Sequence, residues 1–461
     1  MKMITRRGLF LIALIVAFLG CLGFLIYSFV TEGSDWVMKP YNSHIYYNGE
    51  LTGAGKITDV NGRSLAETVD GKREYNDSAT TRRSTLHTVG DTKGFISTGV
   101  QNVYESELTG YNILTGIFRA ANGDTNDMEL TIDADVCDVA YDALKDYKAG
   151  CVGVVNYKTG DIVCMVSTPS YDVQNEPSNM DDDPEYEGVY INRLLTGLYT
   201  PGSTFKIVTA ICAIENIPDI YERTFTCTGE YDPGSGTPIE CNAYHGEINF
   251  EDALAKSCNA TFAQIAIELG PEKLAKTAEQ LGLTSNVAVS GDIMSSTGRF
   301  FLEDGDADDY VGWTGIGQGD TLVSPIAMLR MVGAIANDGK AVSYNLVNSF
   351  ANKAGKVLDF EFTKRETPLI SSDTASKIKS MLRYNVEEQY GDYNYEGLNL
   401  CAKSGTAQID SVDSHNTAWF VGFMDDEENP YAFVVLVEYG NSGSQTAGPI
   451  ANKVLQALVN K

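Results

Sequence analysis

The feature that most constrains the fold is an uncharged apolar stretch of 23 residues at positions 8–30. A helix rises about 1.5 Å per residue, so this stretch is long enough to cross a hydrocarbon core of about 30 Å. Basic residues precede it and acidic residues follow it. The positive-inside rule therefore predicts a cytoplasmic stub at residues 1–7, a transmembrane helix at residues 8–30 and an extracytoplasmic chain after Val30.

A cleaved signal peptide is the alternative for this segment. Its apolar region would be unusually long, and Tyr27-Ser-Phe-Val30 offers no cleavage site of the A-x-A type. We therefore expect a retained single-pass anchor, with the protein working at the outer face of a cell membrane.

Composition and missing motifs argue against several classes of function. The chain carries 34 Lys and Arg against 62 Asp and Glu, a formal charge of −28, so its surface repels phosphate backbones and we expect no nucleic-acid partner. The nine cysteines include no C-x-x-C pair, and none of the four histidines lies in an H-E-x-x-H motif. We therefore predict no metal site and no cofactor. Motifs of hydrolase elbows, phosphate loops and dinucleotide folds are absent from the sequence as well.

The residue pattern divides the chain after the span. Residues 31–127 are polar and rich in Gly, Asn, Thr and Asp, which predicts a small, loop-rich extension. From Met128 onward, longer apolar patterns follow. We place an N-terminal pedestal at residues 31–145 and the main domain at residues 146–461.

The main domain mixes helical and hairpin patterns without a β-α-β alternation, which favours an α+β fold. Apolar runs at 150–156 and 161–167 flank the turn 157–160 and predict a β-hairpin. The predicted helices span residues 205–214, 253–269, 325–336 and 374–386. The other predicted strands span residues 129–133, 416–422 and 431–438.

Three short motifs occur in order along this domain: Ser203-Thr-Phe-Lys206, Ser257-Cys-Asn259 and Lys403-Ser-Gly405. The turn Pro201-Gly202 should start a helix at Ser203, with Lys206 one turn further on the same face. A serine hydroxyl needs a base to become a nucleophile, and a lysine amine can serve if burial keeps it partly neutral. Thr406, just after the third motif, starts a run of small residues that lets a substrate approach a strand.

The same patterns also occur by chance, as Ser376-Lys-Ile-Lys379, Ser343-Tyr-Asn345 and Lys158-Thr-Gly160. Their context separates them from the first set. No Pro-Gly turn precedes Ser376, Lys158 lies at the tip of the predicted hairpin, and Ser343 follows a predicted turn at 337–339. We therefore predict that the first set carries the chemistry.

With these motifs, the chain resembles the class B penicillin-binding proteins. Further segments similar to family signatures are spread over most of the chain outside the membrane: 61–66, 130–133, 167–172, 200–206, 246–259, 315–319 and 418–423. Two departures occur: Asp59-Val-Asn-Gly62 stands where D-R-N-G is frequent, and Ser404 stands where Thr is commoner. Ser404 keeps the hydroxyl, so only fine specificity is affected.

The resemblance implies a penicillin-binding transpeptidase fold and a serine D,D-transpeptidase at a bacterial cell membrane. Such an enzyme cross-links peptidoglycan stem peptides ending in D-Ala-D-Ala through an acyl-enzyme and needs no cofactor. It is inhibited by β-lactam antibiotics, which acylate the same serine.

The resemblance also assigns roles to the matching residues. The catalytic residues would be Ser203 as nucleophile, Lys206 as base, Ser257 as proton relay to the leaving D-alanine, Asn259 as a holder of the substrate amide and Lys403 as a carboxylate ligand. The substrate-binding residues would be Ser404, Gly405 and Thr406. Backbone N–H groups of Ser203 and Thr406 would stabilise the oxyanion.

Three alternatives compete with this assignment. A β-lactamase is disfavoured by the anchor, the pedestal and the similar segments outside the three motifs. A D,D-carboxypeptidase stays open, because it differs only in whether water or an amine resolves the acyl-enzyme. A non-catalytic β-lactam-binding scaffold or sensor is the third, although a sensor should carry several spans or a cytoplasmic signalling domain.

The pedestal is too small for a glycosyltransferase module, which argues against a bifunctional class A protein. The resemblance therefore points to a separate partner, a multi-span glycan polymerase of the SEDS family. Gly20 and Gly23 in the span allow close helix approach, although they lack the spacing of G-x-x-x-G. A plain anchor with a spacer is the alternative.

Cys227 and Cys241 bound a 15-residue segment whose Pro and Gly residues can bring the two thiols together. A disulfide in an oxidising compartment and two buried free thiols both fit this pattern, and the sequence does not choose between them. His245 and His415 are predicted to pack or to hydrogen-bond rather than to act as bases.

Overall fold

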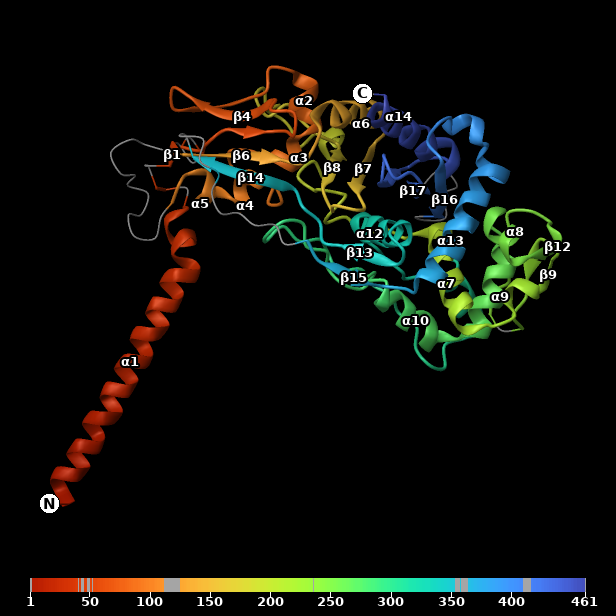
Figure 1. Cartoon of the computed structure of the whole chain (residues 1–461), viewed down its shortest axis with the longest axis horizontal. Helices are drawn as coiled ribbons and strands as arrows, with labels where there is room; N and C mark the ends of the chain where they lie inside the picture. Colours follow the sequence, from red (N-terminus) through yellow and green to blue (C-terminus); the bar gives the residue numbers. More distant parts are fainter. Residues whose placement is uncertain are drawn as a thin grey trace.

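The computed structural model describes residues 2–39, 41–42, 45–47, 50–51, 53–111, 125–234, 236–352, 357, 364–408 and 416–460. Helix α1 (Lys2–Val37) projects alone from one end of the molecule in Figure 1. Within it, Thr5–Val37 is long and apolar enough to cross a membrane, and none of its most apolar stretch is buried against the rest of the chain. The predicted span at 8–30 lies inside this helix.

A five-stranded antiparallel sheet forms the centre of the main body. In spatial order its strands are β16 (Leu400–Gln408), β17 (Asn416–Met424), β18 (Tyr431–Glu438), β7 (Ala149–Asn156) and β8 (Ile162–Thr168). β7 and β8 form the predicted hairpin. Side chains on both faces of β7, β17 and β18 are buried, so helices must cover the sheet on both sides.

Four helices provide this cover (Figure 1). α12 (Pro325–Ala336) and α13 (Ser372–Asn385) pack on one face, and α6 (Ala134–Leu144) and α14 (Gly448–Val459) pack on the other. Every residue of α12 except Arg330 is buried, as expected for a helix that is apolar on all sides. The antiparallel sheet between helical layers confirms the predicted α+β fold.

A second five-stranded sheet forms the pedestal. Its spatial order is β14 (Val347–Asn352), β6 (Asn126–Leu130), β3 (Ile57–Thr58), β4 (Ser64–Val69) and β5 (Lys72–Tyr75), and only the β3–β6 pair is parallel. The short helices near it are α2 (Ala79–Ser84), α3 (Leu86–Val89), α4 (Val100–Val103) and α5 (Glu105–Leu108). β14 comes from the predicted main domain, whereas α6, from the predicted pedestal, packs on the central sheet. The domain boundary between residues 145 and 146 stays a prediction. Both β14 and α6 lie across it, because each packs with the domain to which it was not assigned.

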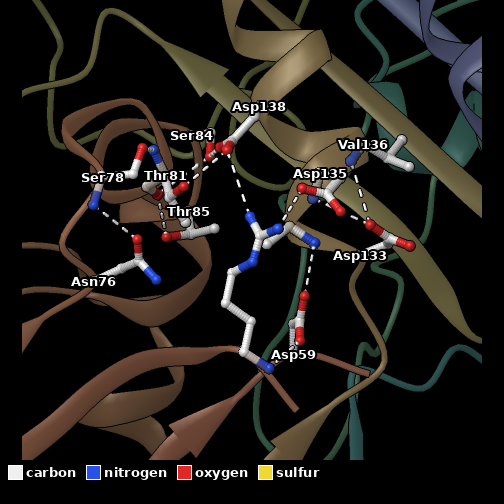
Figure 2. A network of polar contacts seen from close by, with 12 residues as sticks. Asp59, Asn76, Ser78, Thr81, Ser84, Thr85, Asp133, Asp135, Val136 and Asp138 are labelled. Atoms are coloured by element: carbon white, nitrogen blue, oxygen red, sulfur yellow. Dashed lines mark hydrogen bonds and ion pairs between the residues drawn. The ribbon is translucent and has the colours of Figure 1, made fainter. Parts of the chain in front are cut away.

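Figure 2 shows a network of carboxylates where the pedestal meets α6. Asp59 accepts hydrogen bonds from the backbone N–H groups of Arg63 at 2.7 Å and Ala134 at 3.2 Å. The Arg63 guanidinium pairs with Asp135 and Asp138 of α6. Asn61 Nδ2 donates to Asp133 Oδ2 at 3.1 Å, so two of the segments that resemble the family meet at this joint, which fixes α6 against the pedestal.

Short helices and hairpins complete the molecule. The helices on the side opposite the pedestal are α7 (Lys206–Asn216), α8 (Phe250–Ala255), α9 (Asn259–Leu269), α10 (Pro271–Gln280) and α11 (Asp308–Gly315). The two-stranded sheets pair β9 (Thr224–Cys227) with β12 (Gly246–Asn249), β10 (Glu230–Tyr231) with β11 (Ile239–Glu240), β13 (Lys340–Val342) with β15 (Glu366–Pro368), and β1 (Tyr46–Tyr47) with β2 (Glu50–Leu51).

Candidate active site

The five predicted catalytic residues lie together where three parts of the chain meet. Ser203 lies in the 3₁₀ turn η2 (Gly202–Phe205), and Lys206 begins α7 directly after it. Ser257 and Asn259 lie at the junction of α8 and α9, and Lys403 lies in β16. Two lysine amines connect the three motifs.

The turn that carries Ser203 depends on a glycine, Gly202. Gly202 has φ +53°, and a Cβ added to it would lie 2.6 Å from the backbone oxygen of Thr406. Its N–H donates a hydrogen bond to the backbone oxygen of Gly317 at 2.9 Å. Only glycine adopts this backbone conformation without strain in so close a contact. The helix predicted to start at Ser203 therefore begins with a 3₁₀ turn that is packed against β16.

The Lys206 amine makes the central contacts of the site. Its Nζ lies 3.2 Å from Ser203 Oγ, 2.7 Å from the backbone oxygen of Ser257 and 2.6 Å from Asn259 Oδ1. The two carbonyl oxygens only accept hydrogen bonds, so each takes an N–H group of the amine. A neutral amine has two N–H groups and one lone pair, and this lone pair can accept the hydroxyl proton of Ser203 or that of Ser257, whose Oγ lies 3.1 Å away.

Burial changes the pKa of both lysines. The side chains of Lys206 and Lys403 are fully buried. Loss of water disfavours the charged form and lowers the pKa of Lys206 to about 7. The pKa of Lys403 is also well below its ordinary value, first because of burial and second because of the positive charge of Lys206. Near neutral pH, a large fraction of Lys206 is therefore the neutral amine.

The continuous helix predicted over 253–269 is wrong, because the chain forms two helices, α8 and α9, there. Ser257 has φ +55°, which a right-handed helix does not allow. Cys258 then starts α9 as its N-cap, and its Sγ accepts a hydrogen bond from the N–H of Thr261. The break turns the Ser257 side chain out of the helical path.

Ser257 is thereby placed between the two lysines. Its Oγ lies 3.1 Å from Lys206 Nζ and 3.1 Å from Lys403 Nζ. Asn259 is oriented by its Nδ2, which donates to the backbone oxygen of Glu240 at 2.9 Å. A hydroxyl between two amines can pass a proton from one side of the site to the other.

The predicted substrate-binding residues lie on the open edge of β16, the outer strand of the central sheet. The N–H of Ser404 points away from β17 and donates to the hydroxyl of Tyr390 at 2.9 Å. Because N–H directions repeat every two residues, the N–H of Thr406 leaves on the same edge, which faces the turn of Ser203. A Cβ on Gly405 would lie 2.9 Å from the backbone oxygen of Pro201, so the two segments are in close contact.

Tyr390 was not predicted from the sequence. It ends the π-helical turn η4 (Val386–Tyr390) after α13, and its hydroxyl contacts both the N–H of Ser404 and, at 3.0 Å, Ser404 Oγ. No motif marks this position, so only the fold reveals that it fixes the Ser404 side chain.

The chance motifs lie away from these contacts. Ser376 is exposed on α13, and Lys379 pairs with Asp425 at 2.8 Å. Lys158 lies in the turn between β7 and β8, where its amine donates to Asn337 at 3.0 Å. The lysines of these two motifs therefore have other partners than the residues that converge around Lys206.

A group of thiols and an imidazole beside Ser257 was also not predicted. The ligand atoms of Cys227, Cys241, His245 and Cys258 all lie within 4.8 Å of one another. The search for short metal-binding motifs missed this group, because its members are separated in the sequence by 13, 3 and 12 other residues. Cys241-x-x-x-His245 was the one local signal.

The cysteines that the structure describes are free thiols. Of the two alternatives for Cys227 and Cys241, the structure therefore shows free thiols, although Cys241 is half-buried rather than buried. His415 lies outside the described residues.

The chain is similar to known proteins both in sequence and in fold. The family model of the penicillin binding protein transpeptidase domain matches residues 150–456. Peptidoglycan D,D-transpeptidase PbpA of Mycolicibacterium smegmatis is 25% identical over 410 residues, which cover 80% of this chain and 81% of that protein. Penicillin-binding protein 3 of Bacillus subtilis is 26% identical over 380 residues, which cover 76% of this chain and 54% of that protein. The penicillin G acyl-enzyme complex of penicillin-binding protein A from M. tuberculosis shares the fold, with a TM-score of 0.77 and 23% identity over 88% of this chain and 99% of that chain.

Proposed function

Because the chain belongs to the penicillin-binding protein transpeptidase family, we propose that it is a serine D,D-transpeptidase that cross-links peptidoglycan stem peptides. The observation that carries this function is the contact of one buried amine, Lys206 Nζ, with Ser203 Oγ, Ser257 and Asn259. This arrangement joins a nucleophile, a base and a proton relay in one place.

In the acylation step, Ser203 Oγ attacks the carbonyl carbon of the penultimate D-alanine, and the neutral Lys206 amine takes the hydroxyl proton. The N–H groups of Ser203 and Thr406 stabilise the oxyanion of the tetrahedral intermediate. Ser257 passes a proton to the leaving nitrogen, so the C–N bond breaks and terminal D-alanine departs. The product is an ester on Ser203.

In the second step, an amine of another stem peptide attacks this ester. A new amide bond forms as the C–O bond to Ser203 breaks, and the proton of the amine passes through Lys206 to the Ser203 oxygen. Lys403, Ser404 and Thr406 bind the terminal carboxylate of the donor peptide, a role supported by the open edge of β16 and by the Lys403 amine. A β-lactam acylates the same serine.

Product analysis tests this function. The full-length protein is combined with lipid-linked precursor and a glycan polymerase, and the products are scored as cross-linked dimers or trimmed monomers. We expect dimers with the wild type and none with Ser203→Ala. Trimmed monomers without dimers would identify a D,D-carboxypeptidase and contradict the proposal.

The rate of acylation should depend on pH through Lys206. The active form is the neutral amine, whose fraction rises as pH increases through the pKa of about 7. The second-order rate of β-lactam acylation should therefore rise between about pH 6 and pH 8 and level off above, a range set by that pKa. Stopped-flow measurement of acylation across this range, with circular dichroism to verify folding, checks the profile. A flat profile would show that Lys206 is not the titrating base.

We also propose that α1 anchors the protein, with the main body outside the cell, and that α1 and the pedestal bind a SEDS-family polymerase. Apolar side chains of α1 are exposed along its length, and nothing lies within 4 Å of a Cβ added at Gly20 or Gly23. A helix with open glycines can receive a partner helix closely.

Replacing residues 1–127 with an unrelated span and a spacer of equal length tests this partner. We expect co-purification of the polymerase and cell-wall cross-linking both to fall, because the exchanged parts would carry the contacts. Penicillin labelling of the remaining domain reports whether it is folded. Unchanged co-purification and cross-linking with a labelled domain would support the plain anchor instead.

A further inference from the structure

The hydroxyl of Tyr390 lies at the open edge of β16, beside the residues that would bind the substrate carboxylate. We propose that Tyr390 is a positioning residue whose hydroxyl aims the proton of Ser404 at the terminal carboxylate of the donor peptide or of a β-lactam. This inference rests on the proposed function, which assigns that carboxylate to Lys403, Ser404 and Thr406. Tyr390 acts only through Ser404.

The number of donors and acceptors sets the direction of these hydrogen bonds. The N–H of Ser404 donates to the oxygen of the Tyr390 hydroxyl at 2.9 Å, so this oxygen accepts. The two hydroxyl oxygens lie 3.0 Å apart, and a hydroxyl can donate or accept. Among the described residues, Ser404 Oγ is the one acceptor that the Tyr390 proton meets, so Tyr390 donates and Ser404 Oγ accepts. The proton of Ser404 is then left for a further partner.

A carboxylate is the partner that this remaining proton suits. An ionised carboxylate only accepts hydrogen bonds, and its bonds with hydroxyl donors are short and strong. Serine lacks the methyl branch that restricts the side-chain rotation of threonine, so the Ser404 hydroxyl needs a contact to hold it. The Tyr390 hydroxyl supplies that contact before the substrate arrives, which lowers the entropy lost on binding.

The backbone of Ser404 indicates where a bound peptide must end. Its N–H donates to Tyr390, and its carbonyl oxygen accepts from Lys403 Nζ at 2.9 Å. Both groups point to the open edge, because the N–H and C=O of one residue leave an antiparallel strand on the same side. A peptide that adds to β16 as a further strand therefore finds both backbone groups of Ser404 occupied. With the penultimate carbonyl at the N–H of Thr406, backbone pairing stops here and leaves the terminal carboxylate to the Ser404 side chain.

Packing holds Tyr390 in this place. Its ring lies edge-on against Phe420 of β17, with the ring centres 5.4 Å apart and the planes at 72°. The turn η4 ends directly after Tyr390 at Gly391, whose φ of +76° suits glycine. Burial raises the pKa of Tyr390, so its hydroxyl keeps the proton that it donates to Ser404.

Acylation kinetics of the full-length protein in detergent test this role. Tyr390→Phe keeps the ring against Phe420 and removes only the hydroxyl. We expect it to lower the second-order rate of acylation by penicillin G by about 3- to 10-fold, the scale of one hydrogen bond. Rates are normalised to the protein that is acylated at saturation, so an unfolded fraction does not enter the result. The pH at which the rate is half-maximal should stay the same, because Lys206 keeps its contacts.

Penicillin G methyl ester separates this role from a general effect on the fold. The ester carries no charged carboxylate for Ser404, so Tyr390→Phe should change its acylation rate by less than about twofold. Adding Tyr390→Phe to Ser404→Ala should likewise change the rate with penicillin G by less than about twofold, because the hydroxyl through which Tyr390 acts is already gone.

Tyr395→Phe is the matched control for Tyr390→Phe. Tyr395 also packs on Phe420, with the ring centres 5.8 Å apart, but none of its described contacts reaches Ser404. Its rates with both compounds should stay within about twofold of the wild type, as for a site that acts independently of Ser404.

Two results would overturn the inference. One is a rate of Tyr390→Phe with penicillin G equal to that of the wild type, and the other is an equal loss with the acid and with the ester. A wild type that penicillin G does not acylate would contradict the proposed function as well, so the two failures can be told apart.

Discussion

Ser203→Ala is expected to abolish covalent labelling by a fluorescent penicillin. The hydroxyl of Ser203 lies 3.2 Å from a buried amine whose pKa is about 7, and this combination turns a weak nucleophile into a reactive one. Alanine leaves no oxygen to form the ester, so the signal on a gel should fall to background.

Ser376→Ala is the matched control for this result. Ser376 belongs to the same S-x-x-K pattern but is exposed on α13, and its Lys379 is paired with Asp425. Labelling of this variant should equal that of the wild type. A thermal melt verifies that both variants are folded. Retained labelling of Ser203→Ala would show that Ser203 is not the acylated residue.

Lys206→Met should reduce the acylation rate by about 10²- to 10⁴-fold, the usual contribution of a general base. Methionine has a length similar to that of lysine and suits a fully buried position, but it cannot take the proton of Ser203. The rate constant for acylation by penicillin G measures the effect.

Lys379→Met is the control for Lys206→Met, because Lys379 has the same spacing from its serine. We expect its acylation rate to stay within about twofold of the wild type, since a partly exposed ion pair contributes little. Equal losses in the two variants would indicate a general effect on stability rather than the loss of a base.

Local patterns in the sequence predicted much of this fold. The apolar hairpin at 150–167 and the helix at 325–336 are confirmed by β7, β8 and α12, because their burial on all sides gives long apolar runs. The order of the three motifs and the Pro-Gly turn predicted which serines and lysines converge. These features depend on residues that are close in the sequence.

The features that were not predicted depend on distant residues. Apolar residues lie on both sides of Lys256-Ser-Cys-Asn259, so periodicity alone cannot show that Ser257 takes a left-handed conformation and divides the helix. β14 joins the pedestal sheet across more than two hundred residues, by pairing with β6. Tyr390 and the cluster around Cys258 gain their neighbours only in the folded chain.

Peptide mapping of the wild-type protein after brief exposure to penicillin G tests the central claim most directly. Mass spectrometry of the digested protein should find one penicilloyl adduct, on the peptide that contains Ser203, and fragmentation should assign it to that residue. An adduct on Ser257, on Ser376 or on any other residue, or no adduct on a protein that is folded, would contradict the account.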